Sequence, residues 1–166
     1  MGNRRRLLFI YVLSIIILQS SINQLFGQEK VNITAGAGFL EALNLGVRFQ
    51  HKQTQFGFSL GTFPIEDESF FSVSSDFFYH FGGLSDLSER RPWYSRAGLN
   101  YSRDEKSAFV DKLLYLNLRF GRDLNISRRI GIAIDAGIGI RILSDIESGW
   151  DFPVMPNFGL VLFYRL

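Results

Sequence analysis

The feature that most constrains this chain is an alternation of side-chain character that starts at Val31 and continues to the C-terminus. Apolar residues recur at every second position, which is the period of a β-strand because successive side chains point to opposite faces of a sheet. Eight runs follow this pattern, and no stretch has the apolar spacing of an amphipathic helix. They are Val31–Phe39, Leu43–Phe49, Phe56–Gly61, Phe70–Phe81, Trp93–Tyr101, Leu114–Gly121, Ile130–Ile142 and Phe158–Leu166.

The two faces of these runs differ in kind. One phase is apolar or aromatic throughout, and only Ser75 and Ser95 interrupt it. The other phase carries the charges and the glycines of the strand bodies. Its charged members are Arg48, Asp76, Arg96, Arg119, Asp135, Arg141 and Arg165. Such a sparse, glycine-rich set of mixed charge fits a crowded interior in which bulky and small groups interlock.

This partition favours a membrane barrel over a soluble one. A soluble barrel turns its polar phase to water, and that phase is then dense in Lys, Glu and Thr, whereas here it is sparse, rich in glycine and mixed in charge sign. An uninterrupted apolar phase fits contact with lipid, where an open sheet edge is not tolerated and the sheet must close. We therefore predict an all-β, eight-stranded antiparallel up-and-down transmembrane β-barrel. A soluble secreted barrel that binds a hydrophobic ligand, with the two phases reversed, is kept as an alternative.

Residues 1–27 have the pattern of a secretory signal peptide. Arg4, Arg5 and Arg6 form a positive start, and Leu7–Leu18 is an apolar stretch too short to span a bilayer. The predicted domains are a signal peptide at 1–27 and a barrel at 28–166. Without the three arginines the basic residues fall from 18 to 15, against 16 acidic residues. The basic character of the whole chain is thus no evidence for nucleic-acid binding, and none is predicted.

The ends of the runs predict an orientation. Aromatic residues of the apolar phase gather at both ends of the strands, as expected for belts at two membrane interfaces. With the N-terminus in the periplasm, the predicted periplasmic connections are His51–Gln55, Gly82–Pro92 and Arg122–Arg129. The predicted external connections are Leu40–Ala42, Thr62–Ser69, Ser102–Leu113 and Leu143–Asn157.

The charges of the polar phase predict an ionic network inside the barrel. We expect Arg48, Arg96, Arg119 and Arg141 to meet Asp76 and Asp135, with Glu41 from the first external connection as a further candidate. Because arginines outnumber aspartates, Tyr94, Tyr115, Asn44, Asn117 and Gln50 are expected to help as acceptors. An eight-stranded interior is normally filled by side chains, so a plugged lumen is favoured. A narrow porin-like channel for small solutes is the alternative.

Catalytic, metal and cofactor sites are not predicted. The chain has no cysteine and two histidines, His51 and His80, both assigned to the periplasmic end. A lipid-modifying enzyme needs a histidine near the outer rim, so this remains a minor alternative that rests on His80. The acidic external stretch from Asp145 to Asp151 lacks the spacing of a calcium loop.

The last nine residues, Phe158–Leu166, resemble the terminal strand signal of outer-membrane β-barrel proteins of Gram-negative bacteria. Leu160, Leu162 and Tyr164 match its alternating pattern, and the chain ends in Leu166 where the family usually has Phe. With its leader and eight runs, the chain is similar to the OmpA-type transmembrane barrel. The resemblance implies location in the cell outer membrane and insertion by the barrel assembly machinery with the help of periplasmic chaperones. It also implies contact with outer-membrane lipids and lipopolysaccharide. We expect a monomer with a structural or surface-interaction role.

Overall fold

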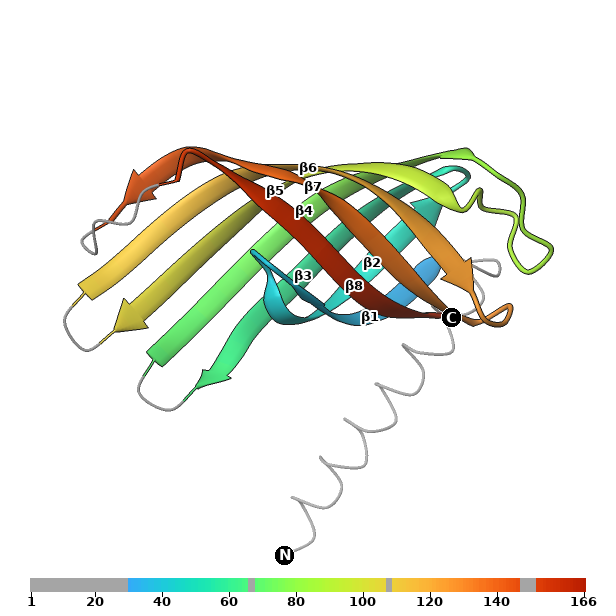
Figure 1. The fold of residues 1–166 in the computed structure, drawn as a ribbon. Coiled ribbons are helices and arrows are strands. Elements are labelled where there is room, and N and C mark those ends of the chain that lie inside the picture. Colours follow the sequence, from blue (N-terminus) through green and yellow to red (C-terminus); the bar gives the residue numbers. More distant parts are fainter. Residues whose placement is uncertain (1–29, 66–67, 107–108, 147–151) are drawn as a thin grey trace, which may run out of the picture.

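The computed structural model describes residues 30–65, 68–106, 109–146 and 152–166, and within them eight antiparallel strands form one closed barrel (Figure 1). The strands follow one another around the barrel in chain order, and β8 pairs with β1 to close it. They are β1 (Val31–Gly38), β2 (Ala42–His51), β3 (Thr54–Ile65), β4 (Glu68–Gly82), β5 (Trp93–Lys106), β6 (Phe109–Asn125), β7 (Ile130–Asp145) and β8 (Val154–Arg165). The predicted fold class is confirmed.

One sequence prediction concerns residues that precede this barrel. The predicted signal peptide, residues 1–27, lies outside the described residues. Within the described part of the chain, no helix has the length and apolar character needed to cross a membrane.

The strands are longer than the apolar alternation that predicts them. β5 continues to Lys106 and β6 resumes at Phe109, so the predicted connection Ser102–Leu113 is wrong for most of its length. The predicted connections Thr62–Ser69, Arg122–Arg129 and Leu143–Asn157 are shortened in the same way. Backbone pairing needs no apolar side chain, so a hairpin extends after both of its faces have become polar.

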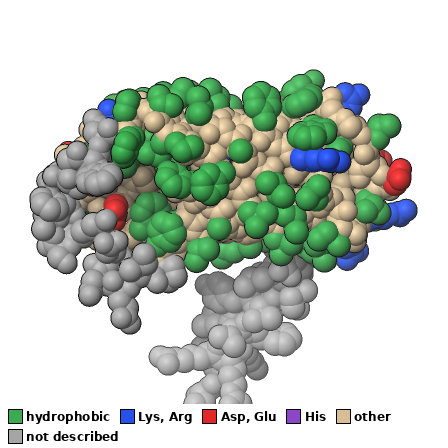
Figure 2. Space-filling model, viewed as in Figure 1, with side chains coloured by type: hydrophobic (Ala, Val, Ile, Leu, Met, Phe, Trp, Pro, Cys, Tyr) green, Lys and Arg blue, Asp and Glu red, His purple; other side chains and the backbone are tan. Residues whose placement is uncertain are grey.

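The bulky apolar phase faces outward. Leu45 on β2 and Phe120 on β6 expose 68% and 69% of their surface, whereas the alternate positions are buried. Figure 2 shows hydrophobic side chains spread over the wall of the barrel between its two ends. A soluble barrel for a hydrophobic ligand would need this phase inside, and that alternative is therefore wrong about which face lines the interior.

Exposed aromatic side chains lie at both ends of the barrel wall. The end that carries the β4–β5 connection is the β4–β5 rim, and the opposite end, which carries the β1–β2 connection, is the β1–β2 rim. At the β4–β5 rim they are Phe49, Phe56, Tyr79, Phe81, Trp93, Phe120 and Tyr164. At the β1–β2 rim they are Phe39, Phe71, Tyr101 and Phe158. The two predicted aromatic belts are thus present on the outer surface.

Candidate functional site

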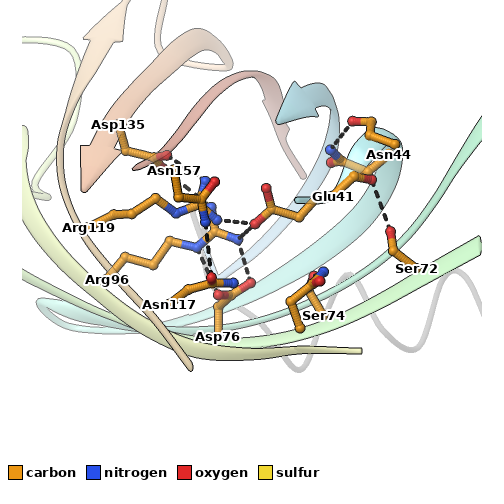
Figure 3. Close-up of polar contacts among 12 residues, drawn as sticks. Glu41, Asn44, Ser72, Ser74, Asp76, Arg96, Asn117, Arg119, Asp135 and Asn157 are labelled. Carbon is orange, nitrogen blue, oxygen red and sulfur yellow. Dashed lines mark hydrogen bonds and ion pairs between the residues drawn. The ribbon is translucent and has the colours of Figure 1, made fainter. Parts of the chain in front are cut away.

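The lumen holds a buried cluster of charged side chains that come from four strands and one connection (Figure 3). Arg96 on β5 lies at its centre. Its Nε and Nη2 donate to Oδ1 and Oδ2 of Asp76 on β4, at 2.8 and 2.6 Å. Nη2 also lies 2.8 Å from Oε1 of Glu41, and Nη1 lies 3.4 Å from Oδ2 of Asp135 on β7. One guanidinium therefore joins all three carboxylates of the cluster.

Arg119 on β6 is the second cation of the cluster and is completely buried. Its Nη1 donates to Oδ1 of Asp135 at 2.9 Å, and its Nη2 pairs with Oε1 of Glu41. The hydroxyl of Tyr94 donates to the other carboxylate oxygen of Asp135 at 2.9 Å. Tyr94 is thus a donor to an acid rather than the predicted acceptor from an arginine.

Glu41 enters the cluster because the β1–β2 connection folds into the lumen. Leu40, Glu41 and Ala42 are all buried, and Ala42 has a left-handed φ of 57°. The backbone oxygen of Glu41 accepts a hydrogen bond of 3.0 Å from the hydroxyl of Ser72. The predicted external connection Leu40–Ala42 is therefore buried inside the barrel, and its carboxylate supplies charge that the strand residues lack.

Glycines of the polar phase make the space that the charged side chains occupy. A Cβ at Gly98 would collide with Oδ1 of Asp76, and one at Gly38 would collide with the carboxylate of Glu41. A Cβ at Gly159 would lie 2.9 Å from Oδ1 of Asp135, closer than real Cβ contacts come. Glycine at these three positions is therefore a packing requirement of the network.

Arg48 lies beside the cluster without joining its ion pairs. Its guanidinium carbon is 4.4 Å from the ring centroid of Phe78, and among the described residues it has no carboxylate within 4.0 Å. The predicted pairing of Arg48 with Asp76 or Asp135 is therefore wrong. Arg48 is nevertheless buried and lines the same small cavity as Glu41 and Asp76. With Arg48 included, three cations face three carboxylates, so the central lumen is electrically balanced.

Arg141, the remaining predicted member, is half-buried on the lumen phase of β7. It pairs in register with Tyr115 on β6, and its backbone N–H donates to the oxygen of Pro153 at 2.9 Å. This position lies toward the β1–β2 rim, six residues along β7 from Asp135. Among the other predicted acceptors, Asn44 donates to the backbone of Ala42, Asn117 accepts from Asn157, and Gln50 accepts from Arg90.

A second buried cluster lies near the β4–β5 rim and includes residues that the sequence analysis did not assign. Arg90, from the β4–β5 connection, donates through Nε and Nη2 to Oδ2 of Asp123, at 3.0 and 2.5 Å. Its Nη1 donates to Oε1 of Gln50 at 2.5 Å. Arg90 and Arg165 both lie over the ring of Phe163. A connection therefore folds inward at this rim as well.

The sequence features that could have identified Asp123 and Arg90 as lumen residues differ. Asp123 stands two positions beyond Gly121 on the same phase, so extending the alternation of β6 would have placed it in the lumen. Arg90 lies in an irregular connection, where no periodicity indicates which side chain turns inward.

His80 is buried at the same rim and is not placed for catalysis with Asp76. Its Nδ1 lies 2.8 Å from the backbone oxygen of Arg91, and its Nε2 lies 3.3 Å from Oε1 of Gln55. His51 is exposed at the end of β2. Across the ranges that the structure describes, no three His, Asp or Glu side chains gather as metal ligands would.

The space left at the centre of the lumen is small. The cavity lined by Glu41, Arg48, Asp76, Arg96 and Arg119 has a volume of about 20 Å³. A polar cavity of this size holds about one water molecule. The geometry of the site thus provides neutralisation of buried charge around a small cavity.

Comparisons with known proteins support the fold and do not assign a family. No family model matches the chain, and no curated protein sequence matches it. Among solved structures, the chain is similar to the N-terminal β-barrel domain of Pseudomonas aeruginosa OprF, with a TM-score of 0.58. The match has 15% sequence identity and covers 84% of this chain and all of that domain. The shared feature is the closed eight-stranded antiparallel barrel.

Proposed function

We propose that this chain is an integral β-barrel of the bacterial outer membrane with a mainly structural or surface-interaction role. The observation that carries the proposal is the distribution of polarity. Leucine, isoleucine, valine and phenylalanine cover the outer wall, while the buried side chains are mostly Asn, Ser, Arg and Asp. A folded chain places its apolar surface away from water, so a barrel of this kind is stable only when lipid surrounds it.

Three further features support a membrane setting. The aromatic belts lie at the two ends of the apolar wall, as amphipathic rings do at headgroup level. Most of the strands reach or exceed the roughly 9–11 residues that a tilted strand needs to cross a bilayer. The pairing of β8 with β1 leaves no open edge among the described strands. Outer-membrane lipids and lipopolysaccharide would be its immediate surroundings, reached through the barrel assembly machinery and periplasmic chaperones.

The lumen favours a plugged barrel over a permeation pathway. Leu40 and Glu41 fold in from one rim, Arg90 folds in from the other, and the ion pairs of Arg96 and Arg119 occupy the middle. The balanced charge of the central cluster lowers the cost of burying it, since Arg96 and Arg119 both contact carboxylates there. No catalytic activity is part of this proposal.

The ends of β5 and β6 support a role in surface contacts. Beyond the aromatic residue Tyr101, this hairpin continues with Arg103, Glu105 and Lys112 on the outward phase, and all three are exposed. Charged side chains in that position cannot face hydrocarbon, so the hairpin would project into the aqueous phase outside the cell. A paired projection offers a rigid surface for a ligand or a neighbouring cell.

Conductance measurements test the plug directly. The protein is reconstituted into planar bilayers, and its insertion is checked independently by protease protection in vesicles. A plugged barrel gives inserted protein without stepwise current. Regular current steps from inserted protein would overturn the plug and establish the narrow channel that the sequence analysis kept as its alternative.

A further inference from the structure

The two rims of the barrel differ in charge. At the β4–β5 rim the exposed basic residues outnumber the exposed acidic ones, which are Asp86 and Glu89 in the described part of the chain. The exposed basic residues are Lys30, Lys52, Arg91, Arg122, Arg128 and Arg129. Figure 2 shows blue side chains at the right-hand end, where Figure 1 places the green β4–β5 connection. This end faces the periplasm in the proposed orientation, so its surface complements anionic headgroups of the inner leaflet.

Arg122 differs from the other basic residues of this rim because it belongs to the outward phase of β6. In register it stands between Trp93 on β5 and Ile134 on β7, two outward-facing apolar side chains. Its guanidinium carbon lies 5.2 Å from the ring centroid of Trp93. It is exposed, and within the described ranges no carboxylate comes within 4.0 Å of it. A cation thus lies against an aromatic ring at the boundary of the apolar wall.

An apolar groove begins at the next outward-facing residues of β5 and β6, toward the middle of the wall. Going from Trp93 toward the middle of β5, the next two outward residues are the small Ser95 and Ala97. Phe77 on β4, with Leu118 and Phe120 on β6, flank them. The groove between these side chains has a volume of about 230 Å³, and its surface is almost entirely apolar.

A second hollow lies on the other side of Arg122, at the rim itself. It is lined by Leu84, Ser85, Pro92, Arg122 and Asn125, among others, and has a volume of about 250 Å³. Its surface is mostly polar, in contrast to the groove. From the β4–β5 rim toward the middle of the wall, the outer surface of β5 and β6 therefore presents a polar hollow, then the guanidinium of Arg122, and then an apolar groove. A phospholipid has the same order of headgroup, phosphate and acyl chain.

We propose that this wall binds an anionic phospholipid of the periplasmic leaflet, with its phosphate on Arg122 and one acyl chain in the groove over Ser95 and Ala97. Guanidinium binds phosphate oxygens in two-pronged geometry, and Trp93 keeps Arg122 in place for it. The surplus of basic residues at the rim selects a headgroup with net negative charge over a zwitterionic one. This inference rests on the proposed membrane location and names one lipid class that the barrel holds there.

Quenching of Trp93 fluorescence by brominated lipid tests the site. The chain has two tryptophans, so Trp150→Phe leaves Trp93 as the only emitter. Vesicles of one fixed mixture of phosphatidylcholine and phosphatidylglycerol carry bromine either on the phosphatidylglycerol or on an equal amount of the phosphatidylcholine. Only the identity of the quenching lipid changes between the two samples. We expect phosphatidylglycerol beside Trp93 to be enriched about fivefold over its share of the bilayer.

Three variants separate a defined site from diffuse attraction to a basic rim. Arg122→Gln is expected to abolish most of the preference for brominated phosphatidylglycerol. Arg128→Gln removes one exposed charge from the same rim, away from the groove, and is expected to keep the preference. Ala97→Leu fills the groove without changing charge and is expected to reduce quenching by phosphatidylglycerol.

The outcomes are distinguishable from a failure of the proposed function. Each variant is first shown to be inserted, by protease protection in the same vesicles. Inserted protein that is quenched equally by both brominated lipids would overturn the site while leaving the membrane barrel intact. Equal losses in Arg122→Gln and Arg128→Gln would also overturn it, because the attraction would then be diffuse. Protein that fails to insert would overturn the proposed function itself.

Discussion

Arg96 and Asp76 form a bidentate ion pair inside the barrel, with two nearly parallel hydrogen bonds of 2.8 and 2.6 Å. The pair is diagonal across β4 and β5, since the register partner of Asp76 is Gly98 and that of Arg96 is Phe78. The missing side chain at Gly98 leaves the space through which the two groups meet. The contact therefore depends on the register of β4 and β5 and on the absence of a side chain at Gly98. A change in that register would separate the two charged groups.

Removing one partner of this pair is expected to destabilise the barrel strongly. Asp76→Ala leaves a guanidinium buried with fewer acceptors, which costs about 3–5 kcal/mol in comparable buried pairs. Urea unfolding of the protein refolded into detergent micelles measures the change. Arg103→Ala serves as the control, because its pair with Glu105 is about half exposed and is worth about 0–1 kcal/mol. Similar losses in both variants would contradict the central position of Asp76.

The space at Gly98 gives a second test. Gly98→Val adds atoms where the carboxylate of Asp76 stands and is expected to cost about 1–3 kcal/mol or more. The matched change is Ala97→Val, one residue away on the outward face, where added methyl groups meet lipid. We expect the first variant to lower the urea midpoint and the second to leave it nearly unchanged. The reverse order would mean that the two faces of β5 are interchanged.

Charge on the two faces of β6 should be tolerated very differently. Leu116→Arg places a cation on the outward phase near the middle of the wall and is expected to cost about 2–4 kcal/mol. Asn117→Asp, on the lumen side, keeps the acceptor that binds Asn157 at 3.0 Å and should cost less. Folding yields into lipid vesicles, measured side by side, check the difference. Equal tolerance of both changes would refute the assignment of faces.

Glu41 is expected to act both as a counter-ion and as a seal. Glu41→Ala removes a carboxylate that contacts both Arg96 and Arg119, so two buried guanidinium groups compete for the remaining acids. We expect a lower unfolding midpoint and, because the space then admits water, a measurable increase in bilayer conductance over the wild type. Asp145→Ala, an exposed carboxylate at the same rim, is the control and should leave both readouts unchanged.

Much of this fold could be predicted from the sequence because the outer wall is apolar and the lumen is polar, so alternate residues differ in kind. The phase of Ile130–Ile142 predicts which side of β7 faces outward, and the phase of Asp135 places it in the lumen. The extent of the hairpins could not be predicted in this way, because the alternation ends where both faces meet water. Asp104 still pairs in register with Asp111 there, beyond the last apolar residue of the alternation.

The interior was predicted less completely than the wall. The lumen positions of Asp76, Arg96, Arg119 and Asp135 follow from their phase, but which cation meets which acid depends on side-chain reach across strands. Arg48 shows this, since it lies against Phe78 and not against an aspartate. Arg90 comes from a connection, and its inward path depends on tertiary packing against Asp123 and Phe163. Local sequence carries no signal for that path.

Gel mobility in SDS, compared before and after boiling for protein extracted from outer membranes, is the sharpest test of the closed transmembrane barrel. Such a barrel stays folded in cold SDS and migrates differently once boiling unfolds it. We expect to find the protein in the outer-membrane fraction and to see this heat-dependent shift. Recovery in the soluble fraction, with the same mobility in both samples, would contradict it.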